Sequence, residues 1–383
     1  MVKKCIIAKN YCIFAPDKIL ETMLHIDDQH RLVYCSDNIQ GKCVIPDDVV
    51  EIKSSAFQRC SSLQEIIIPK SVKKIGERAF ADCPSLEKIT VEEGNPTYDS
   101  RSECNAIVET VTNTVIAGCK NTRIPESIQH IHPDAFEGTR ALIPIQNVVI
   151  ELMDNKVFLK ELFIPEEIEE IKIYPDDMFL ELLPESILYQ TEKFDYQAIS
   201  SLEKISVSPN NKIYDSRENC NAIIETASNK LLFGCATTSI PNNVIEIDDN
   251  AFSECSTLEE VIIPNGVTRI GACSFCACSS LQRIVLPSSL NEIDEFAFID
   301  CKNLSEINIP KSVTIIGEGV FEGCEKLSEI RLPDSVKVIG EAQISDGVFY
   351  RCKALKRIYI PKGQKQRFIE MGLDEYKDLL CEE

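Results

Sequence analysis

The chain of 383 residues contains no tryptophan, and aromatic residues make up only 7% of it, so aliphatic side chains must fill its core. Positive charge is also scarce: the chain has 40 Lys and Arg residues but 61 Asp and Glu residues, which gives a formal net charge of −21. Nucleic acids and anionic membrane surfaces are bound through positive footprints. The charge balance therefore argues against both classes of partner and favours a solvated acidic exterior.

Long apolar runs are absent as well, and no stretch approaches the roughly 18 residues of a membrane-spanning helix. The N-terminal stretch lacks the continuous apolar segment of a signal peptide, because Lys9, Asn10, Pro16 and Asp17 interrupt it. We therefore predict a cytoplasmic protein if this N-terminus is native. A cell-surface or secreted protein is the alternative.

What the sequence does contain is a repeat of 23 residues. Its proline recurs at this interval within two runs, at Pro46 and Pro69, and then at Pro241, Pro264, Pro287, Pro310 and Pro333. Its phenylalanine recurs in the same way, at Phe57 and Phe80, and then at Phe252, Phe275, Phe298 and Phe321. A period of this size is typical of solenoids and propellers. Since 23 residues are too few for a propeller blade or two helices, each unit is predicted to form one turn of a coil.

Each unit has one short strand and a second extended segment. Leu304, Ile307 and Ile309 recur at offsets of three and two, and the repeat's proline ends this branched run, as expected for a strand. Neighbouring turns would place these strands side by side in a parallel sheet. A second extended segment follows the proline. After this segment the chain turns, and the side chain of Phe321 is predicted to enter the core. No unit can bury its apolar face alone, so stability must come from stacked neighbours.

The unit can be written C-x-x-L-x-x-I-x-I-P-x-S-V-x-x-I-G-x-x-A-F-x-x-C, and it resembles the BspA-type (Treponema-type) class of leucine-rich repeats. The match is almost letter for letter over residues 43–90 and 240–361. The resemblance implies a right-handed, curved solenoid with a parallel β-sheet and short turns or helical turns on the other side. It also implies a role in binding other proteins. Several members resemble bacterial surface or secreted adhesion proteins, whereas others lack any export signal.

A longer repeat is superimposed on the short one. "YDSRSECNAIVET" at 98–110 returns as "YDSRENCNAIIET" at 214–226, with ten of 13 positions identical and a shift of 116 residues. The segment that follows indicates two short strands around a polar turn. We therefore predict β-hairpin insertions at about 98–120 and 214–236. They either decorate the solenoid or bind a partner.

Three domains are predicted: an N-terminal cap at 1–40, the solenoid at 41–361, and a C-terminal helical cap at 362–383. Phe368, Leu373 and Leu379 would cover the last turn of the solenoid. The repeat is irregular at about 141–200, where apolar positions persist at Leu159, Leu162, Ile164, Pro165, Ile168, Ile171 and Phe179. We interpret this stretch as irregular turns of one solenoid, because it lacks the composition of a linker.

Seven of the 18 cysteines hold one repeat position. This set lies three residues after the phenylalanine, at Cys60, Cys83, Cys255, Cys278, Cys301, Cys324 and Cys352, and is predicted to form a column of buried, reduced thiols. Cys104 with Cys119, and Cys220 with Cys235, bracket the hairpins and are either disulfides or free thiols. Cys273 and Cys276 lie at variable positions and lack the second half of a zinc motif, although they resemble a metal or redox cluster.

No catalytic, cofactor-binding or metal-binding residues are predicted. His130 and His132 flank Ile131, which occupies an inward repeat position, so both are expected on the surface, with a metal pair as the alternative. The glycines between Gly317 and Gly323 resemble a phosphate loop, but they fall at repeat corners and no Lys-Ser/Thr follows. No hydrolase, metalloprotease or kinase signature is present.

Information for recognition must lie at the outward positions of the strands. We name as the exposed stripe the candidate partner-binding residues Glu65, Ile67, Glu260, Ile262, Arg283, Val285, Asn308, Arg331 and Tyr359. Apolar groups among paired charges on a wide sheet suit a protein-binding face, although branched residues also simply favour strands. The favoured hypothesis is a non-enzymatic scaffold that binds a protein partner through this face. The alternative is an exported adhesin that binds host or matrix proteins or glycans.

Overall fold

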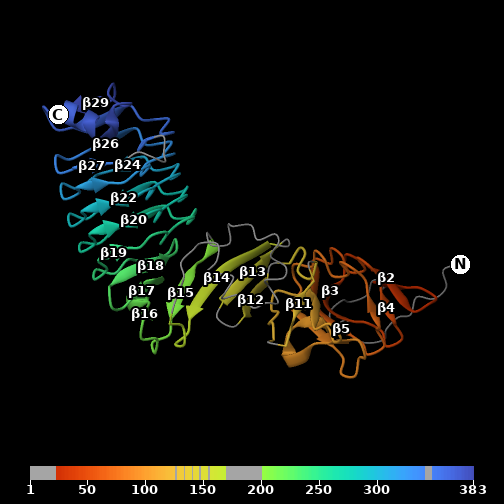
Figure 1. Cartoon of the computed structure of the whole chain (residues 1–383). Helices are drawn as coiled ribbons and strands as arrows, with labels where there is room; N and C mark the ends of the chain where they lie inside the picture. The colour runs from red at the N-terminus through yellow and green to blue at the C-terminus, as the bar shows by residue number, and fades with distance from the viewer. Residues whose placement is uncertain are drawn as a thin grey trace. The chain divides into compact units, whose positions relative to one another are not determined.

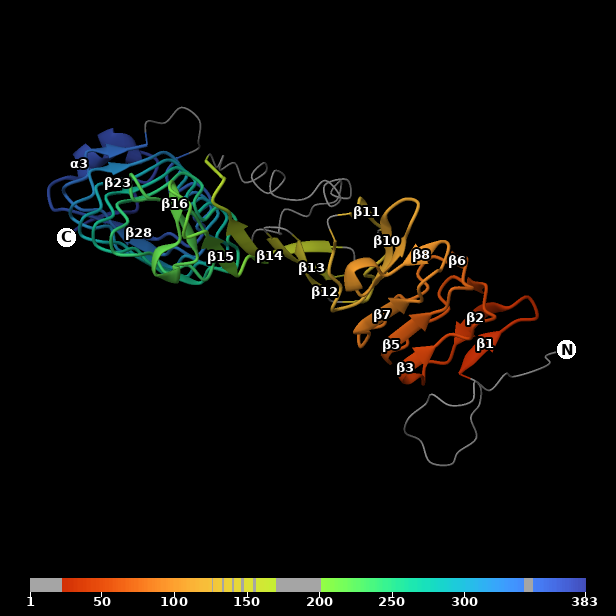
Figure 2. The ribbon, with the colours of Figure 1, turned by 90° about the horizontal axis from the view of Figure 1, so that it is seen from below.

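The computed structural model describes residues 23–125, 127–132, 134–139, 141–145, 148–153, 156–169, 201–340 and 347–383. The chain divides into two compact units: unit 1 includes Met1–Phe158, and unit 2 includes Leu159–Glu181 and Tyr196–Glu383. In unit 2 successive turns lie one above another (Figure 1) and overlie as loops when viewed from below (Figure 2). This arrangement confirms the solenoid predicted from the 23-residue period.

Each turn of unit 2 contributes strands to two parallel sheets. The strands that precede the repeat's proline are β20 (Glu260–Ile262), β22 (Arg283–Val285), β24 (Glu306–Ile307), β26 (Glu329–Arg331) and β28 (Arg357–Ile360). β20, β22 and β24 form one parallel group and β26 and β28 belong to another, and an isolated parallel bridge between Asn308 and Arg331 links the two; we call them together the first sheet. The segments that follow the proline form a second sheet, with β19 (Glu246–Ile247), β21 (Arg269–Ile270), β23 (Glu292–Ile293), β25 (Ile315–Ile316) and β27 (Val338–Ile339). Neighbouring strands pair one repeat apart, as Val261 does with Ile284. The predicted second extended segment is therefore a sheet of its own.

Unit 1 contains the same two sheets. The first consists of β3 (Gln40–Val44), β5 (Ser62–Ile68) and β7 (Lys88–Val91), paired in parallel. The second contains β4 (Glu51–Ile52) and β6 (Lys74–Ile75), preceded by β1 (Leu24–Ile26) and β2 (Arg31–Cys35). β1 and β2 pair antiparallel, whereas β2 pairs in parallel with β4. The second sheet of unit 1 therefore begins with a hairpin.

The predicted hairpin insertions are present: the one in unit 2 extends the second sheet, whereas the one in unit 1 belongs to a separate four-stranded sheet. In unit 1 the elements are β8 (Tyr98–Asp99), η1 (Arg101–Glu103), β9 (Ala106–Glu109), β10 (Thr114–Gly118) and β11 (His130–Ile131). In unit 2 they are β16 (Tyr214–Asp215), η4 (Arg217–Asn219), β17 (Ala222–Glu225) and β18 (Lys230–Gly234), followed by β19. β9 pairs antiparallel with β10, as β17 does with β18, and the second strand of each hairpin then pairs in parallel with the next strand.

The residues shared by the two insertions are used in internal contacts. Arg101 Nε donates to Asp99 Oδ1 at 2.9 Å, and Arg101 Nη1 donates to Asn113 Oδ1 in the hairpin turn at 2.8 Å. Arg217 makes the equivalent bonds to Asp215 at 2.7 Å and to Asn229 at 2.7 Å. The duplicated motif therefore links each hairpin turn to the short strand, β8 or β16, that precedes the hairpin, as expected if the insertion decorates the coil.

A column of stacked phenylalanine rings fills the corner of unit 2. Phe252, Phe275, Phe298 and Phe321 are fully buried, and adjacent ring centroids lie 5.0, 5.5 and 5.9 Å apart with nearly parallel planes. Phe349 continues the column at 5.6 Å from Phe321, despite the residues inserted before it. In unit 1, Phe57 and Phe80 stack at 5.2 Å. The prediction that equivalent side chains share equivalent environments is confirmed.

At each hairpin insertion, a glycine occupies the place in the phenylalanine column that a ring fills in the regular turns. A Cβ atom on Gly234 would collide with the ring of Phe252, and one on Gly118 would collide with the ring of Phe136. Glycine at these positions therefore lets the first ring after each hairpin lie directly against the backbone.

The cysteine set forms a second column beside the rings. Cys278 Sγ donates to Phe252 O at 3.1 Å, and Cys301 Sγ donates to Phe275 O at 3.2 Å, so each thiol bonds to the preceding turn. The same bond occurs in Cys83, Cys324 and Cys352. All members are buried except Cys352, which is half-buried. A small weak donor at this corner both packs and ties one turn to the next.

The remaining described segments flank these repeats. β12 (Ala141–Ile145) and β13 (Val148–Met153) pair antiparallel in unit 1. The later residues of β14 (Lys156–Ile164) pair in parallel with β15 (Lys204–Val207) in unit 2. Leu159, Leu162 and Ile164 are buried, as their repeat positions predict. The predictions for Ile171 and Phe179 fall outside the described residues.

The C-terminal segment packs on the last turn of unit 2. It contains α3 (Lys365–Phe368), η5 (Ile369–Leu373) and β29 (Leu380–Glu382), and the last of these pairs in parallel with β28. Phe368 and Leu373 are fully buried, whereas Leu379 is half-buried and Leu380 is buried. The sequence indicated a helix and gave no sign of the strand, which adds one more row to the first sheet.

Candidate interaction surface

The strands of the first sheet turn alternate side chains outward. On β20, Val261 is buried, whereas the flanking Glu260 and Ile262 are exposed, as period-two geometry requires. Ile262 has 64% of its surface exposed, which is unusual for an isoleucine in a paired strand. The exposed stripe therefore faces solvent on β20, at the positions that the repeat predicted.

Parallel register aligns the stripe of unit 2 into two rows. One row begins with Glu260, which pairs with Arg283, and Arg283 then pairs with Glu306. In the other row Ile262 pairs with Val285, Asn308 is bridged to Arg331, and Arg331 pairs with Tyr359. Val285 and Asn308 line one cleft between these two parts of the row. The structure therefore brings seven of the nine stripe residues onto one sheet face.

The two ends of this face differ in chemistry. Near β20, Arg283 Nη1 and Glu260 Oε1 form an exposed ion pair at 2.8 Å, of a kind that contributes little to stability. Near β28, the Arg331 guanidinium lies 4.3 Å from the centre of the Tyr359 ring, in a cation–π contact. Arg331 Nε also donates to Glu383 Oε1 at 3.1 Å, and Tyr359 Oη donates to Glu329 Oε2 at 3.3 Å. Arg331 and Tyr359 are thus held by internal contacts.

A wide, shallow groove lies beside the apolar end of this face. Its volume is about 910 Å³, and its lining is mixed: apolar residues include Ile240, Ile262, Pro264, Val285, Leu286 and Pro287, and polar residues include Thr238, Ser239, Asn265 and Ser288. The carboxylate of Glu260 and the side chain of Asn242 also border it. A smaller cleft of about 140 Å³ follows on the same sheet, lined by Arg283, Val285 and Asn308 among others. An open groove that combines apolar and polar side chains has the composition of a non-obligate protein-binding surface.

The stripe residues of unit 1 make a different surface. Glu65 is half-buried, and its carboxylate lies 3.1 Å from Lys42 Nζ and 3.7 Å from Lys88 Nζ. Ile67 is half-buried and pairs in register with Val44 and Thr90. Because neighbours cover much of both side chains, unit 1 presents less free apolar surface here than unit 2 does at Ile262.

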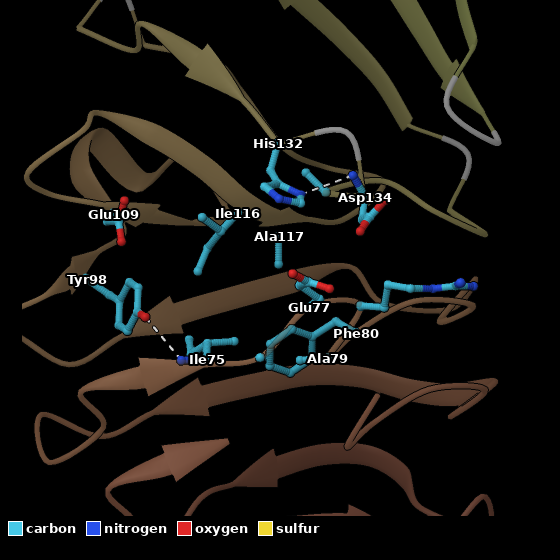
Figure 3. Close-up of a pocket in the computed structure, with 13 residues that line it drawn as sticks. Ile75, Glu77, Ala79, Phe80, Tyr98, Glu109, Ile116, Ala117, His132 and Asp134 are labelled. Carbon is cyan, nitrogen blue, oxygen red and sulfur yellow. Dashed lines mark hydrogen bonds between the residues drawn. The ribbon is translucent and has the colours of Figure 1, made fainter. Parts of the chain in front are cut away.

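Unit 1 has a small pocket at the corner next to its hairpin insertion (Figure 3). It has a volume of about 110 Å³ and is lined by Glu77, Tyr98, Glu109, His132 and Asp134 among others. Burial raises the pKa of Tyr98, whose hydroxyl accepts a hydrogen bond from Ile75 N at 3.1 Å. Pockets that bind small organic ligands usually have volumes of roughly 300–1,000 Å³. This pocket is too small for such a ligand.

The structure corrects one expectation about the histidines. Ile131 is buried and His130 is exposed, as predicted. His132, however, is half-buried and borders the pocket, where its Nδ1 accepts a hydrogen bond from Asp134 N at 3.2 Å. The sequence could not show this, because the pocket arises where the hairpin interrupts the regular corner. Within the described ranges, no group of three or more His, Cys, Asp or Glu side chains is arranged to hold a metal ion.

The remaining sequence motifs have structural roles. A Cβ atom on Gly317 would collide with the backbone of Glu295 in the preceding turn, so the glycine permits close packing at a repeat corner. Cys104, Cys119, Cys220 and Cys235 are free and buried.

None of the helices in the described part of the chain has the length and apolar character to cross a membrane.

Two stacked parallel sheets with a repeated corner define a leucine-rich repeat solenoid. The chain belongs to the family described as BspA type leucine-rich repeat region, whose model matches it in six copies over residues 32–142 and 228–343. No curated protein matches the chain.

Solved structures of bacterial leucine-rich repeat proteins resemble the chain. A leucine-rich cell surface protein from Faecalibacterium prausnitzii is 21% identical, over 94% of this chain and 98% of its own, with a TM-score of 0.43. A leucine-rich repeat protein from Bacteroides ovatus is 21% identical, over 97% of this chain and 99% of its own, with a TM-score of 0.32. A leucine-rich repeat protein from T. pallidum is 31% identical, over 36% of this chain and 66% of its own, with a TM-score of 0.31.

Proposed function

We propose that this protein is a non-enzymatic scaffold that binds another protein through the first sheet of unit 2. The observation that carries the proposal is the open groove of mixed lining beside β20 and β22, together with the exposure of Ile262. At 64% exposure, Ile262 leaves much of its apolar surface in water. A partner that covered it would remove this apolar surface from water, and full burial of such a side chain contributes about 1.5–3 kcal/mol.

The polar groups at the edge of the groove suit a protein ligand. Arg283 and Glu260 present one charge of each sign beside Ile262 and Val285. Such a mixture resembles an interface with an apolar centre and a polar rim. The Arg331–Tyr359 pair extends the face with a rigid aromatic and a guanidinium, two groups that are enriched at binding hot spots.

The test uses a double variant, Ile262→Asp with Val285→Asp, and a matched control, Ile245→Asp. Ile245 is also an exposed isoleucine of unit 2, at 47%, but it precedes strand β19 of the second sheet. Tyr359 is left unchanged because its replacement would also break its contacts with Arg331 and Glu329. Proteins captured from native lysate by the wild-type chain would be purified, and their affinities for the three chains would be measured by titration calorimetry.

We expect the double variant to lose at least about ten-fold in affinity, which corresponds to about 1.4 kcal/mol, and the control to bind like the wild type. Far-ultraviolet circular dichroism would establish that all three chains are folded. Equal binding by the wild type and the double variant would exclude this face as the binding site.

A further inference from the structure

Two cysteines of unit 2 stand apart from the buried column. Cys273 and Cys276 lie in the turn at the corner between β21 and β22, before the column member Cys278. At the equivalent corner of the preceding turn the chain has Asn250 and Ser253, so the repeat does not require thiols at these positions. Their presence therefore calls for an explanation other than packing.

The backbone holds the two residues at the distance that a disulfide needs. Cys276 N donates to Cys273 O at 3.0 Å, which closes a four-residue turn. The ends of such a turn have Cα atoms less than about 7 Å apart, and disulfides join Cα atoms about 4.4–6.8 Å apart. Neighbouring turns fix this geometry on both sides, because Cys273 N donates to Glu295 O at 3.0 Å and Glu254 N donates to Cys276 O at 2.7 Å.

The two thiols are close enough to affect each other's ionisation, and both are partly exposed. The hydrogen bond between them lowers the pKa of Cys273 to about 7 and raises that of Cys276, although burial and the nearby Asp249 and Glu295 oppose the lowering. Since the thiolate is the reactive form, Cys273 is the nucleophile of the pair. Both side chains are partly exposed, whereas Cys278 is fully buried.

Unit 1 provides an internal comparison. The thiols of Cys35 and Cys60 also affect each other's ionisation, which lowers the pKa of Cys60 and raises that of Cys35. However, their exposed fractions are only 2% and 0%. The thiols of this second pair are near each other but buried. Comparing the two pairs therefore separates the effect of proximity on thiol oxidation from the effect of solvent exposure.

We propose that Cys273 and Cys276 are a reversible redox modification site that is oxidised to a disulfide by low-molecular-weight or protein disulfides. In the first step the Cys273 thiolate attacks one sulfur of the oxidant, forms a mixed disulfide and releases one thiolate. In the second step Cys276 loses its proton and its sulfur attacks Cys273, which releases the second thiolate. The protein loses two hydrogen atoms in total, and the oxidant gains them as two thiols.

The test equilibrates the folded full chain with graded mixtures of reduced and oxidised glutathione, then quenches with acid and alkylates the remaining thiols after unfolding. Trypsin would release Ile270–Arg283, a single peptide that contains Cys273, Cys276 and Cys278. We expect this peptide to lose two hydrogens, with Cys278 alkylated and the other two cysteines cross-linked. The pair Cys35 and Cys60 should remain reduced in the same digest.

The single variant Cys276→Ser separates the two steps. It should accumulate a glutathione adduct at Cys273, whereas the wild type should resolve that adduct into the internal disulfide. The proposal is overturned if Cys273 and Cys276 both stay alkylatable under conditions that oxidise Cys35 and Cys60. It is equally overturned if the cross-link joins Cys276 to Cys278, or if Cys276→Ser carries no more adduct than the wild type.

Discussion

Replacement of Phe298 by leucine tests whether the solenoid is stabilised turn by turn. The Phe298 ring is fully buried between Phe275, at 5.5 Å, and Phe321, at 5.9 Å. Leucine retains most of the apolar bulk, and swaps that conserve volume cost less than about 1.5 kcal/mol. Each lost stacking contact adds about 0.5–1.5 kcal/mol. We therefore expect the free energy of unfolding of unit 2 to fall by about 2–3 kcal/mol.

The stronger test is whether pairs of replacements are coupled. Phe275→Leu with Phe298→Leu removes rings that touch, so the double-mutant cycle should give a coupling energy of about 0.5–1.5 kcal/mol. Phe252→Leu with Phe298→Leu removes rings that are separated by Phe275, and their effects should add within about 0.5 kcal/mol. This contrast follows because each turn contacts only its neighbours.

The assay is urea unfolding followed by far-ultraviolet circular dichroism, because the chain has no tryptophan to report by fluorescence. An unchanged dependence of the unfolding free energy on urea would show that the variants alter stability and not the surface exposed on unfolding. Equal coupling in the two cycles would refute nearest-neighbour stacking, and so would a loss below about 1 kcal/mol for Phe298→Leu.

Two further predictions concern single side chains of unit 1. Burial raises the pKa of Cys83 from 9.0 to about 12, so the stability that the thiol contributes is present below about pH 9 and is lost as the pH rises towards 12. Cys83→Ala should therefore make the free energy of unfolding, measured by urea titration at several pH values, fall less steeply over this window; an identical slope would contradict this. Asn95 Nδ2 donates to Pro69 O at 3.0 Å and to Val72 O at 2.9 Å, so Asn95→Asp should cost about 1–3 kcal/mol at neutral pH and recover in part when the new carboxyl is protonated. An unchanged free energy of unfolding for Asn95→Asp would show that these hydrogen bonds do not stabilise the turn.

The repeat made much of the fold predictable. The inward Leu, Ile, Phe and Cys positions recur at one interval, and a stacked solenoid is the arrangement that buries all of them against their equivalents. Phe298 and Phe321 accordingly lie in matching environments, and the hairpin insertions appear where the duplicated segment predicted them. The outward orientation of Ile262 followed from the same alternation.

Other features had weak or misleading signals in the sequence. The hairpin β1–β2 has the topology of the two insertions but lacks their duplicated motif, so composition alone did not reveal it. The strand β29 is three residues long, and its pairing with β28 depends on a partner that is distant in the sequence. Cys273 and Cys276 looked like incidental variable positions until the turn brought their thiols together.

The sequence by itself determined the period, the inward positions and the insertions, because stacking forces every turn to repeat the same buried pattern. The tertiary structure decided which outward residues share a surface. Whether Ile262 lines an open groove while Ile67 is half-covered depends on neighbouring side chains and turns, which the repeat leaves free to vary. The tertiary structure also placed His132 at the border of a pocket. It left Cys273 and Cys276 partly exposed and buried Cys35 and Cys60, because the exposure of a side chain depends on packing that no single repeat encodes.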